Sequence, residues 1–253
     1  MTAALRVALG EYDTGWHDVD TSLARAREVV TEAKRHGAEL VVLPEMCTTG
    51  FTMDPAQAER LDGPGVRGLS AIARGAGVAV LAGVAIREAD GAEDRAVNTA
   101  ILFGRDGAQH AMYRKQRVFA YAGEDKVYTP GRESSVVVLG GVRVALFVCY
   151  DLRFPELFRA VARDVDAMVV IANWPAARRP HWDLLIRARA IENQCYVAAV
   201  NRVGTGGGLT YDGGSAAYDP WGERLTSTRG IVTIDTERVR AVRTEFPFLR
   251  DMA

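Results

Sequence analysis

The sequence is poor in cysteine, and this scarcity limits how the chain can be held together. Its three cysteines are Cys47, Cys149 and Cys195, an odd number with wide spacings and no CxxC pattern. Such a set gives no disulfide framework, and the histidines supply no zinc-binding spacing beside it. We therefore expect a reduced protein of the cytoplasm, without a bound metal.

The chain also lacks an excess of charge of either sign and any long apolar run. It has 31 basic and 32 acidic side chains, a formal net charge of −1. This balance argues against binding to nucleic acids or anionic membranes through bulk charge. No apolar run approaches the roughly 20 residues of a membrane span, and the first residues lack the basic and apolar regions of a signal peptide. We expect no nucleic-acid partner and no membrane contact.

A phosphate-binding loop is a third missing feature. The glycine-rich "GTGGG" at 204–208 follows a predicted strand but precedes no helix, and no GxGxxG or GxxxxGK pattern is present. Without a helix N-terminus after the glycines, a nucleotide site is not expected there, and we interpret the segment as a flexible turn.

What the chain does have is a sizeable apolar content and an alternation of strands and helices. Hydrophobic residues make up 48% of its 253 residues, which suits a single domain over 1–253. Val19, Leu23, Ala26 and Val30 form the stripe of an amphipathic helix, with Asp18 or Asp20 as its cap and Gly37 after its end. The predicted helices are 17–37, 64–77, 154–164 and 181–194. The predicted strands are 4–9, 38–45, 78–86, 96–103, 106–115, a hairpin over 134–150, 165–173, 195–203, 214–218 and 230–235. This order predicts an α/β fold with one mixed sheet or two sheets covered by helices.

Three predicted strands end directly at an ionisable group. "LVVLPE" ends in Glu45, "MYRK" in Lys115 and "ALFVC" in Cys149. Each alone has an ordinary explanation: a loop acid, a solvated lysine, a buried core thiol. Together they are more informative, because strand ends in α/β folds hold catalytic groups rigidly beside a pocket. A thiol is a strong nucleophile only as thiolate, so a carboxylate base and an ammonium group beside it would form a working set.

These three segments resemble the three signatures of the nitrilase superfamily of carbon–nitrogen hydrolases, in the same order. The matching stretches are "LPEM" with Glu45, "YRKQ" with Lys115 and "VCYDLRFPE" with Cys149. Supporting stretches are "NTA" at 98–100, "YTPG" at 128–131, "ANWP" at 172–175, "RARAIENQ" at 187–194 and "YDPWGE" at 218–223. The last four, with "TTGF" at 48–51, look most like the ω-amidase branch.

The resemblance implies an αββα sandwich, with two mixed sheets flanked by helices, and a Glu-Lys-Cys triad. Carried onto this chain, Cys149 is the nucleophile, Glu45 the general base and Lys115 the oxyanion stabiliser. The backbone N–H of Tyr150 is the second oxyanion donor, and Glu124 supports Lys115 and the substrate. The implied reaction is hydrolysis of a small amide through a thioester, without any cofactor, by a homodimer.

The substrate-binding residues are weaker predictions. The resemblance places "ANWP" after the strand that follows the nucleophile, so Asn173 and Trp174 are expected to line the pocket; core packing is the alternative for Trp174. Arg178 follows and could bind a substrate carboxylate, although a solvated arginine is the ordinary expectation. Phe119 is a candidate apolar wall, as is Phe51, with a core position as the alternative for both.

Arg117 stands where many relatives have a histidine, in "KQR", and we count it among the expected substrate-binding residues. This departure and the atypical "VFAYAGEDK" at 118–126 put the ω-amidase specificity in question, not the triad. Asp151, Arg153 and Glu156 are expected to hold the turn after Cys149 through an ion-pair network.

Several activities fit the same triad. The alternatives to an ω-amidase acting on monoamides of 2-oxo-dicarboxylic acids are a nitrilase, an N-carbamoyl amidohydrolase and an amidase for small aliphatic amides. A non-catalytic binding module is a remote further alternative, against which the intact set of Glu45, Lys115 and Cys149 argues.

Overall fold

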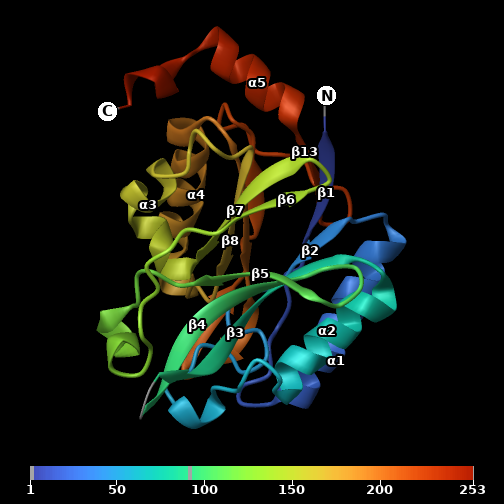
Figure 1. The fold of residues 1–253 in the computed structure, drawn as a ribbon, viewed down its shortest axis with the longest axis vertical. Helices are drawn as coiled ribbons and strands as arrows, with labels where there is room; N and C mark the ends of the chain where they lie inside the picture. The colour runs from blue at the N-terminus through green and yellow to red at the C-terminus, as the bar shows by residue number, and fades with distance from the viewer. Residues whose placement is uncertain (1–2, 91–92, 253) are drawn as a thin grey trace.

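The computed structural model describes residues 3–90 and 93–252. Most strands lie in two large sheets that stack face to face (Figure 1), and two further strands pair in a separate ribbon. The first sheet has the order β13-β1-β2-β3-β4-β5. Its strands are β1 (Ala4–Leu9), β2 (Leu40–Val42), β3 (Ala79–Asp90), β4 (Glu93–Phe103), β5 (Gln109–Arg114) and β13 (Ile231–Asp235). β1, β2 and β3 run parallel and the outer strands pair antiparallel, so the sheet is mixed.

The second sheet has the order β12-β9-β8-β7-β6 and is also mixed. Its strands are β6 (Val136–Leu139), β7 (Val142–Val148), β8 (Ala167–Ala172), β9 (Tyr196–Asn201) and β12 (Ala216–Tyr218). The three central strands, β7, β8 and β9, run parallel. β8 and β9 are buried throughout, as expected for parallel strands covered on both faces.

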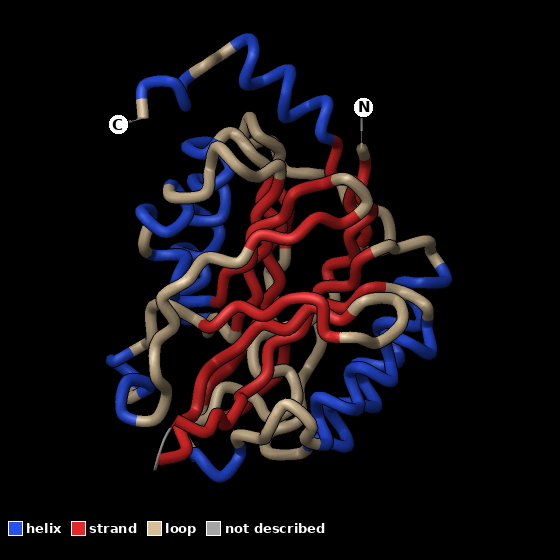
Figure 2. The backbone as a smooth tube through the Cα atoms, viewed as in Figure 1, coloured by secondary structure: helices blue, strands red, loops and turns tan. Residues whose placement is uncertain are grey.

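Helices cover the outer face of each sheet, as Figure 2 shows. Those on the first sheet are α1 (Val19–Arg35) and α2 (Pro64–Ala76), and those on the second are α3 (Pro155–Arg159) and α4 (Arg179–Asn193). α1 begins where its sequence predicts, because Asp18 accepts a hydrogen bond from the backbone of Thr21. The predicted architecture of two mixed sheets flanked by helices is confirmed.

One apolar core lies between the two sheets and ties them together. It contains Val7, Leu81 and Leu102 of the first sheet together with Leu146 and Val169 of the second. A second core packs the first sheet against α1 and α2. Burial of apolar surface in the shared core therefore fixes the position of one sheet relative to the other, and with it the positions of the strand ends.

The structure differs from the sequence-based prediction in three elements. The predicted helix 154–164 ends at Arg159, and the chain continues in i→i+3 turns. The segment "GTGGG" belongs to a hairpin of β10 (Val203–Gly206) and β11 (Leu209–Asp212), in which Gly207 and Gly208 both have positive φ, the backbone of a tight hairpin turn. Helix α5 (Thr236–Glu245) was not predicted; it extends beyond β13 at the edge of the molecule (Figure 1).

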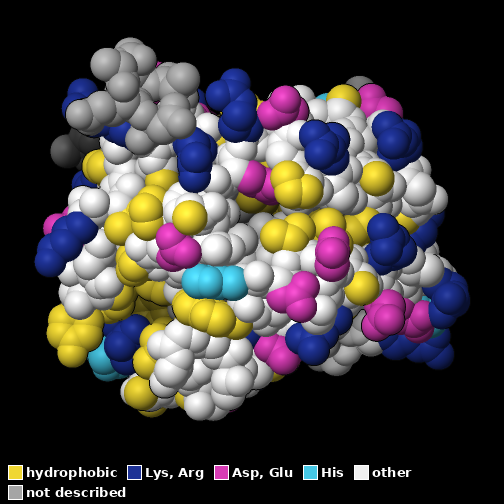
Figure 3. Space-filling view, turned by 90° about the horizontal axis from the view of Figure 1, so that it is seen from below, with side chains coloured by type: hydrophobic (Ala, Val, Ile, Leu, Met, Phe, Trp, Pro, Cys, Tyr) yellow, Lys and Arg dark blue, Asp and Glu magenta, His cyan; other side chains and the backbone are white. Residues whose placement is uncertain are grey.

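The surface carries charges of both signs. On the face drawn in Figure 3, basic and acidic side chains are interspersed, in keeping with the net charge of −1. Within the described ranges, no helix is both long and apolar enough to cross a bilayer.

Candidate active site

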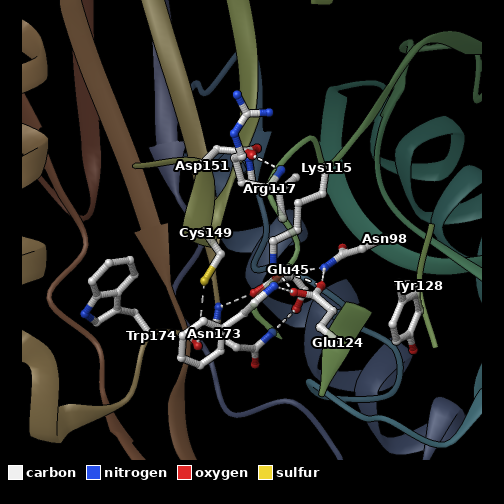
Figure 4. Close-up of polar contacts among 12 residues, drawn as sticks. Glu45, Asn98, Lys115, Arg117, Glu124, Tyr128, Cys149, Asp151, Asn173 and Trp174 are labelled. Atoms are coloured by element: carbon white, nitrogen blue, oxygen red, sulfur yellow. Dashed lines mark hydrogen bonds and ion pairs between the residues drawn. The ribbon is translucent and has the colours of Figure 1, made fainter. Parts of the chain in front are cut away.

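The three ionisable strand ends meet between the two sheets. Glu45 follows β2 and Lys115 follows β5 of the first sheet, whereas Cys149 follows β7 of the second (Figure 4). The lysine Nζ lies 2.9 Å from Glu45 Oε1. The exposed fractions of the three residues are 0%, 1% and 8%, so the set is shielded from solvent. The arrangement therefore joins a carboxylate, an ammonium group and a thiol in one dry site.

Glu45 is fixed through its backbone and its carboxylate. The chain on either side of it bonds to Gly83 of β3: the Gly83 N–H donates to Pro44 O at 3.1 Å, and the Cys47 N–H donates to Gly83 O at 2.8 Å. A Cβ at position 83 would lie 2.5 Å from Glu45 Cα, so only glycine permits this approach. The carboxylate Oε2 accepts the Asn173 N–H at 2.9 Å.

Lys115 lies between two carboxylates. Its Nζ is 2.9 Å from Glu124 Oε2 and 3.0 Å from Glu124 Oε1, in addition to its contact with Glu45. Burial favours the neutral amine, but Glu124 and Glu45 together outweigh it and raise the pKa of Lys115. The lysine is therefore a permanent cation at neutral pH, as an oxyanion stabiliser has to be.

Cys149 occupies a strained turn at the end of β7. Its φ is +47°, in the left-handed region that a residue with a Cβ rarely adopts. Burial, and after it the charge of Glu45, raises the pKa of the thiol well above its usual value. The resting group is consequently a thiol, which has to lose its proton to a base before it can attack.

Asp151 holds this turn through hydrogen bonds. Its carboxylate accepts the Val148 N–H at 2.9 Å, the Arg117 N–H at 2.8 Å and the Tyr113 hydroxyl at 2.8 Å. Burial raises the pKa of Asp151 to about 6, while these hydrogen bonds oppose the shift.

The predicted ion-pair network of Asp151, Arg153 and Glu156 is not what the structure contains. The Arg153 guanidinium lies over the Trp174 ring, 4.9 Å from its centroid, and Glu156 lies 3.4 Å from Arg117. The physical reason is that Asp151 is fully buried, whereas Glu156 is exposed on α3 and Arg153 lies beside the cavity.

A cavity of about 270 Å³ opens in front of Cys149. Besides Cys149, five of the residues predicted for the site line it: Phe119, Tyr150, Asn173, Trp174 and Arg178. Phe51 lines it as well. Trp174 is only 3% exposed, and its ring centroid lies 5.6 Å from that of Trp182. It is therefore both a core residue and part of the cavity wall.

Arg117, also predicted to bind substrate, is not among the residues that line this cavity. Its guanidinium lies over the ring of Phe154, 5.3 Å from the centroid, and close to Glu156. In Figure 4 it lies beside Asp151.

Asn98 is a site residue to which the sequence analysis gave no role. Its Nδ2 donates to Glu45 Oε1 at 2.7 Å and to Glu124 Oε1 at 2.9 Å, and its backbone O accepts the Lys115 N–H at 2.8 Å. One residue of β4 therefore bonds to Glu45, Glu124 and Lys115. The available signal was a polar residue inside the apolar strand "AVNTAILF".

Two further residues were missed. Asn201 at the end of β9 accepts the Trp174 N–H at 2.7 Å and returns a hydrogen bond to Trp174 O at 2.9 Å, which positions "ANWP". Tyr211 of β11 lines the cavity opposite Cys149's strand. Neither stands out in the sequence, since their roles depend on contacts across distant strands.

As for metals, no group of three or more histidine, cysteine, aspartate or glutamate side chains suited to hold an ion is found in 3–90 and 93–252.

Comparison with known proteins assigns the family. The model of the carbon–nitrogen hydrolases matches residues 6–244. The chain belongs to this family. It is 35% identical over 257 aligned residues to the omega-amidase YafV of Escherichia coli, covering 98% of this chain and 96% of that protein. It is 32% identical to the 2-oxoglutaramate amidase of Bacillus subtilis, with 96% and 95% covered.

Solved structures agree with the fold. XC1258 from Xanthomonas campestris, a CN-hydrolase superfamily protein with an arsenic adduct in its active site, superposes with a TM-score of 0.88 at 36% identity, covering 99% of this chain and 97% of that one. The predicted membership of the nitrilase superfamily is therefore confirmed, and this carbon–nitrogen hydrolase is an enzyme that hydrolyses amides.

Proposed function

We propose that the enzyme is an ω-amidase that converts a carboxylate-bearing primary amide to the acid and ammonia through a thioester on Cys149. The observation that carries this proposal is the cavity in which the Cys149 thiol and the Arg178 guanidinium both lie. It is supported by the names of the relatives, omega-amidase and 2-oxoglutaramate amidase.

In the first step the Sγ of Cys149 attacks the amide carbon while Glu45 accepts the thiol proton. The charge moves to the amide oxygen, which Lys115 Nζ and the Tyr150 N–H stabilise. The Tyr150 N–H lies in the first turn of the short helix Cys149–Arg153, where N–H groups have no partner within the helix. Glu124 can share one N–H of Lys115 between its two oxygens, which leaves another for the oxyanion.

The tetrahedral intermediate then collapses. Glu45 returns its proton to the amide nitrogen, the C–N bond breaks, ammonia leaves and the thioester remains. A water molecule next gives its proton to Glu45 and attacks the thioester carbon. The C–S bond breaks, the sulfur recovers the proton from Glu45, and the carboxylic acid is released.

Arg178 supports a substrate with a carboxylate at its other end. Its guanidinium lies 5.2 Å from the centroid of the Phe119 ring, and no carboxylate within the described residues pairs with it. An arginine in a mostly apolar cavity matches the charge and planar shape of a carboxylate.

Ammonia release over a panel of substrates tests the proposal. The panel contains a carboxylate-bearing amide, a neutral aliphatic amide, the corresponding nitrile and an N-carbamoyl amino acid. We expect the highest kcat/KM for the carboxylate-bearing amide. A faster reaction of the nitrile, of the carbamoyl compound or of the neutral amide would instead support one of the three alternative activities.

The covalent step is tested on Cys149 itself. Mass spectrometry of enzyme quenched during turnover should reveal the acyl group of the substrate on the peptide that contains Cys149. Cys149→Ala should abolish ammonia release and leave the melting temperature close to that of the wild type, because only Sγ is removed. Full activity of this variant would contradict the nucleophile assignment.

We also propose that residues 1–253 form a single hydrolase domain that works as a cytoplasmic homodimer. The core shared by both sheets supports the single domain, and three buried free thiols suit a reducing compartment. Support for a dimer comes from Leu184 and Ile191, which are seven residues apart on one face of α4 and are 69% and 48% exposed.

A further inference from the structure

The hairpin β10–β11 belongs to neither large sheet and covers the catalytic cavity. Gly206, Gly207, Leu209 and Tyr211 of this segment all line the cavity. Cys149 follows a strand of the second sheet. The hairpin contributes none of the three residues of the proposed triad.

The hairpin is held firmly in place at both strands. The buried Arg202 guanidinium donates to Asp13 Oδ1 at 2.8 Å and to Thr205 O at 3.0 Å. On the other strand, Asp212 lies 3.4 Å from Arg179, which follows Arg178 directly. Residues on β11 therefore have a fixed position relative to Arg178.

Trp16 packs against the glycines of this hairpin. A Cβ on Gly206 or Gly207 would come within 2.9 or 2.7 Å of its indole, so the glycines make room for the ring. The hairpin is consequently a packed wall, and its side chains face the cavity in a defined arrangement.

Tyr211 is the polar side chain that this wall presents to the cavity. It is 3% exposed, and the Arg202 guanidinium lies 4.7 Å from its ring centroid on one side. Tyr211 lines the same cavity as Cys149 and Arg178. Burial raises the pKa of Tyr211 to about 12, so the hydroxyl carries its proton at neutral pH.

Three other buried phenols have a hydrogen-bond partner within the chain. The Tyr12 hydroxyl donates to Cys47 O at 3.0 Å, the Tyr113 hydroxyl to Asp151 at 2.8 Å and the Tyr128 hydroxyl to Thr52 O at 2.9 Å. The Tyr211 hydroxyl makes no hydrogen bond to any residue that the structure describes. Because Tyr211 lines the cavity, its hydroxyl is free to bond a substrate bound there.

We propose that Tyr211 is a specificity-determining residue whose hydroxyl donates a hydrogen bond to the substrate carboxylate that Arg178 binds. This inference rests on the proposed function and adds to it a second contact, on a different element, for the same substrate group. The two side chains enclose the anionic end of the amide, while the carboxamide end reaches Cys149.

The test compares two substrates that differ only at the far end. Succinamate carries a carboxylate there, and 4-oxopentanamide replaces it with a neutral methyl ketone of similar shape. For Tyr211→Phe we expect kcat/KM for succinamate to fall about 10- to 100-fold, mainly through KM, and kcat/KM for 4-oxopentanamide to change less than about twofold. We also expect the double variant Tyr211→Phe/Arg178→Met to lose less kcat/KM for succinamate than the product of the fold-losses of the two single variants. The reason is that both groups contact one carboxylate.

Tyr12→Phe is the matched control. It removes a buried phenol hydroxyl outside the cavity, so it should lower the melting temperature but leave the ratio of the two kcat/KM values unchanged. Equal losses on both substrates, or no loss, in Tyr211→Phe would overturn the role of Tyr211 even if the wild type prefers succinamate. A wild-type enzyme without that preference would overturn the carboxylate subsite itself, and this inference with it.

Discussion

At the scale of the residue, Asn98 decides how two like charges share one buried site. Glu45 and Glu124 would repel each other in a medium of low dielectric constant, and Lys115 neutralises only one of them. The single amide nitrogen of Asn98 donates one hydrogen bond to each carboxylate, at 2.7 and 2.9 Å. It thereby keeps the two acids apart and oriented without adding charge.

We predict that Asn98→Ala lowers kcat about 100-fold and the free energy of unfolding by about 2–3 kcal/mol. Each carboxylate loses a charge-assisted hydrogen bond that solvent cannot replace. Steady-state kinetics and urea denaturation measure the two effects.

Thr99→Val provides the control for Asn98. Thr99 is the next residue on β4, is equally buried, and points to the opposite face of the sheet. Its replacement should leave kcat within about twofold of the wild type. An unchanged kcat in Asn98→Ala would show that the carboxylates do not need this bridge.

The three residues of the proposed triad could be located from the sequence, whereas the residues that position them could not. Glu45 and Cys149 follow apolar runs and Lys115 follows a predicted strand, and strand ends are visible in a sequence. The roles of Asn98 and Tyr211 depend on which side chains face each other across sheets, and contacts such as that between Asn98 and Glu45, 53 residues apart, leave no local pattern.

At the scale of the element, strand β3 acts as the support for the loop that carries Glu45. Gly83 exchanges backbone hydrogen bonds with Pro44 and Cys47, on both sides of the catalytic acid. The absence of a side chain at this position is therefore part of the active site's construction.

We predict that Gly83→Ala lowers the free energy of unfolding by about 3 kcal/mol and strongly reduces kcat. The added Cβ would lie 2.5 Å from Glu45 Cα and 2.7 Å from Met46 N, so the loop has to move. Thermal unfolding and ammonia release check the two effects.

Gly75→Ala is the control, because it makes the same substitution at a position where the added Cβ has free space. Gly75 lies within α2, and a Cβ there meets nothing within 4 Å. Alanine in a helix interior is favoured over glycine by roughly 0.5–1 kcal/mol, so this variant should be slightly more stable and fully active. Similar behaviour of the two variants would refute the close approach at Gly83.

Elements were predicted well where their pattern is local and poorly where tertiary structure defines them. The paired glycines after Gly206 suggested a turn, but the strands they connect have little apolar alternation of their own. α5 was missed because only Thr236, Val239 and Val242 are buried in a helix that is otherwise polar.

At the scale of the whole molecule, the proposed catalytic groups come from both sheets and depend on the core between them. Glu45 and Lys115 belong to the first sheet and Cys149 to the second. The distance between base and nucleophile is thus set by the packing of one sheet on the other.

We predict that the enzyme unfolds in one cooperative transition in which activity and secondary structure are lost together. The shared core leaves neither sheet able to bury its inner face alone. Activity and far-ultraviolet circular dichroism, followed across a urea series, should have the same midpoint. Two separate midpoints would contradict both this prediction and the single domain.

The position of the hairpin outside both sheets has a consequence for how such enzymes diverge. The groups proposed to break the C–N bond lie at strand ends of the two large sheets, and changes there endanger folding and catalysis together. The twelve residues from Arg202 to Gly213 form a separate two-stranded ribbon, which contacts the rest of the chain at Tyr12 and Asp13. Exchange of this ribbon, by natural selection or by design, can therefore change which amide the enzyme accepts. The residues proposed to carry out the hydrolysis stay the same.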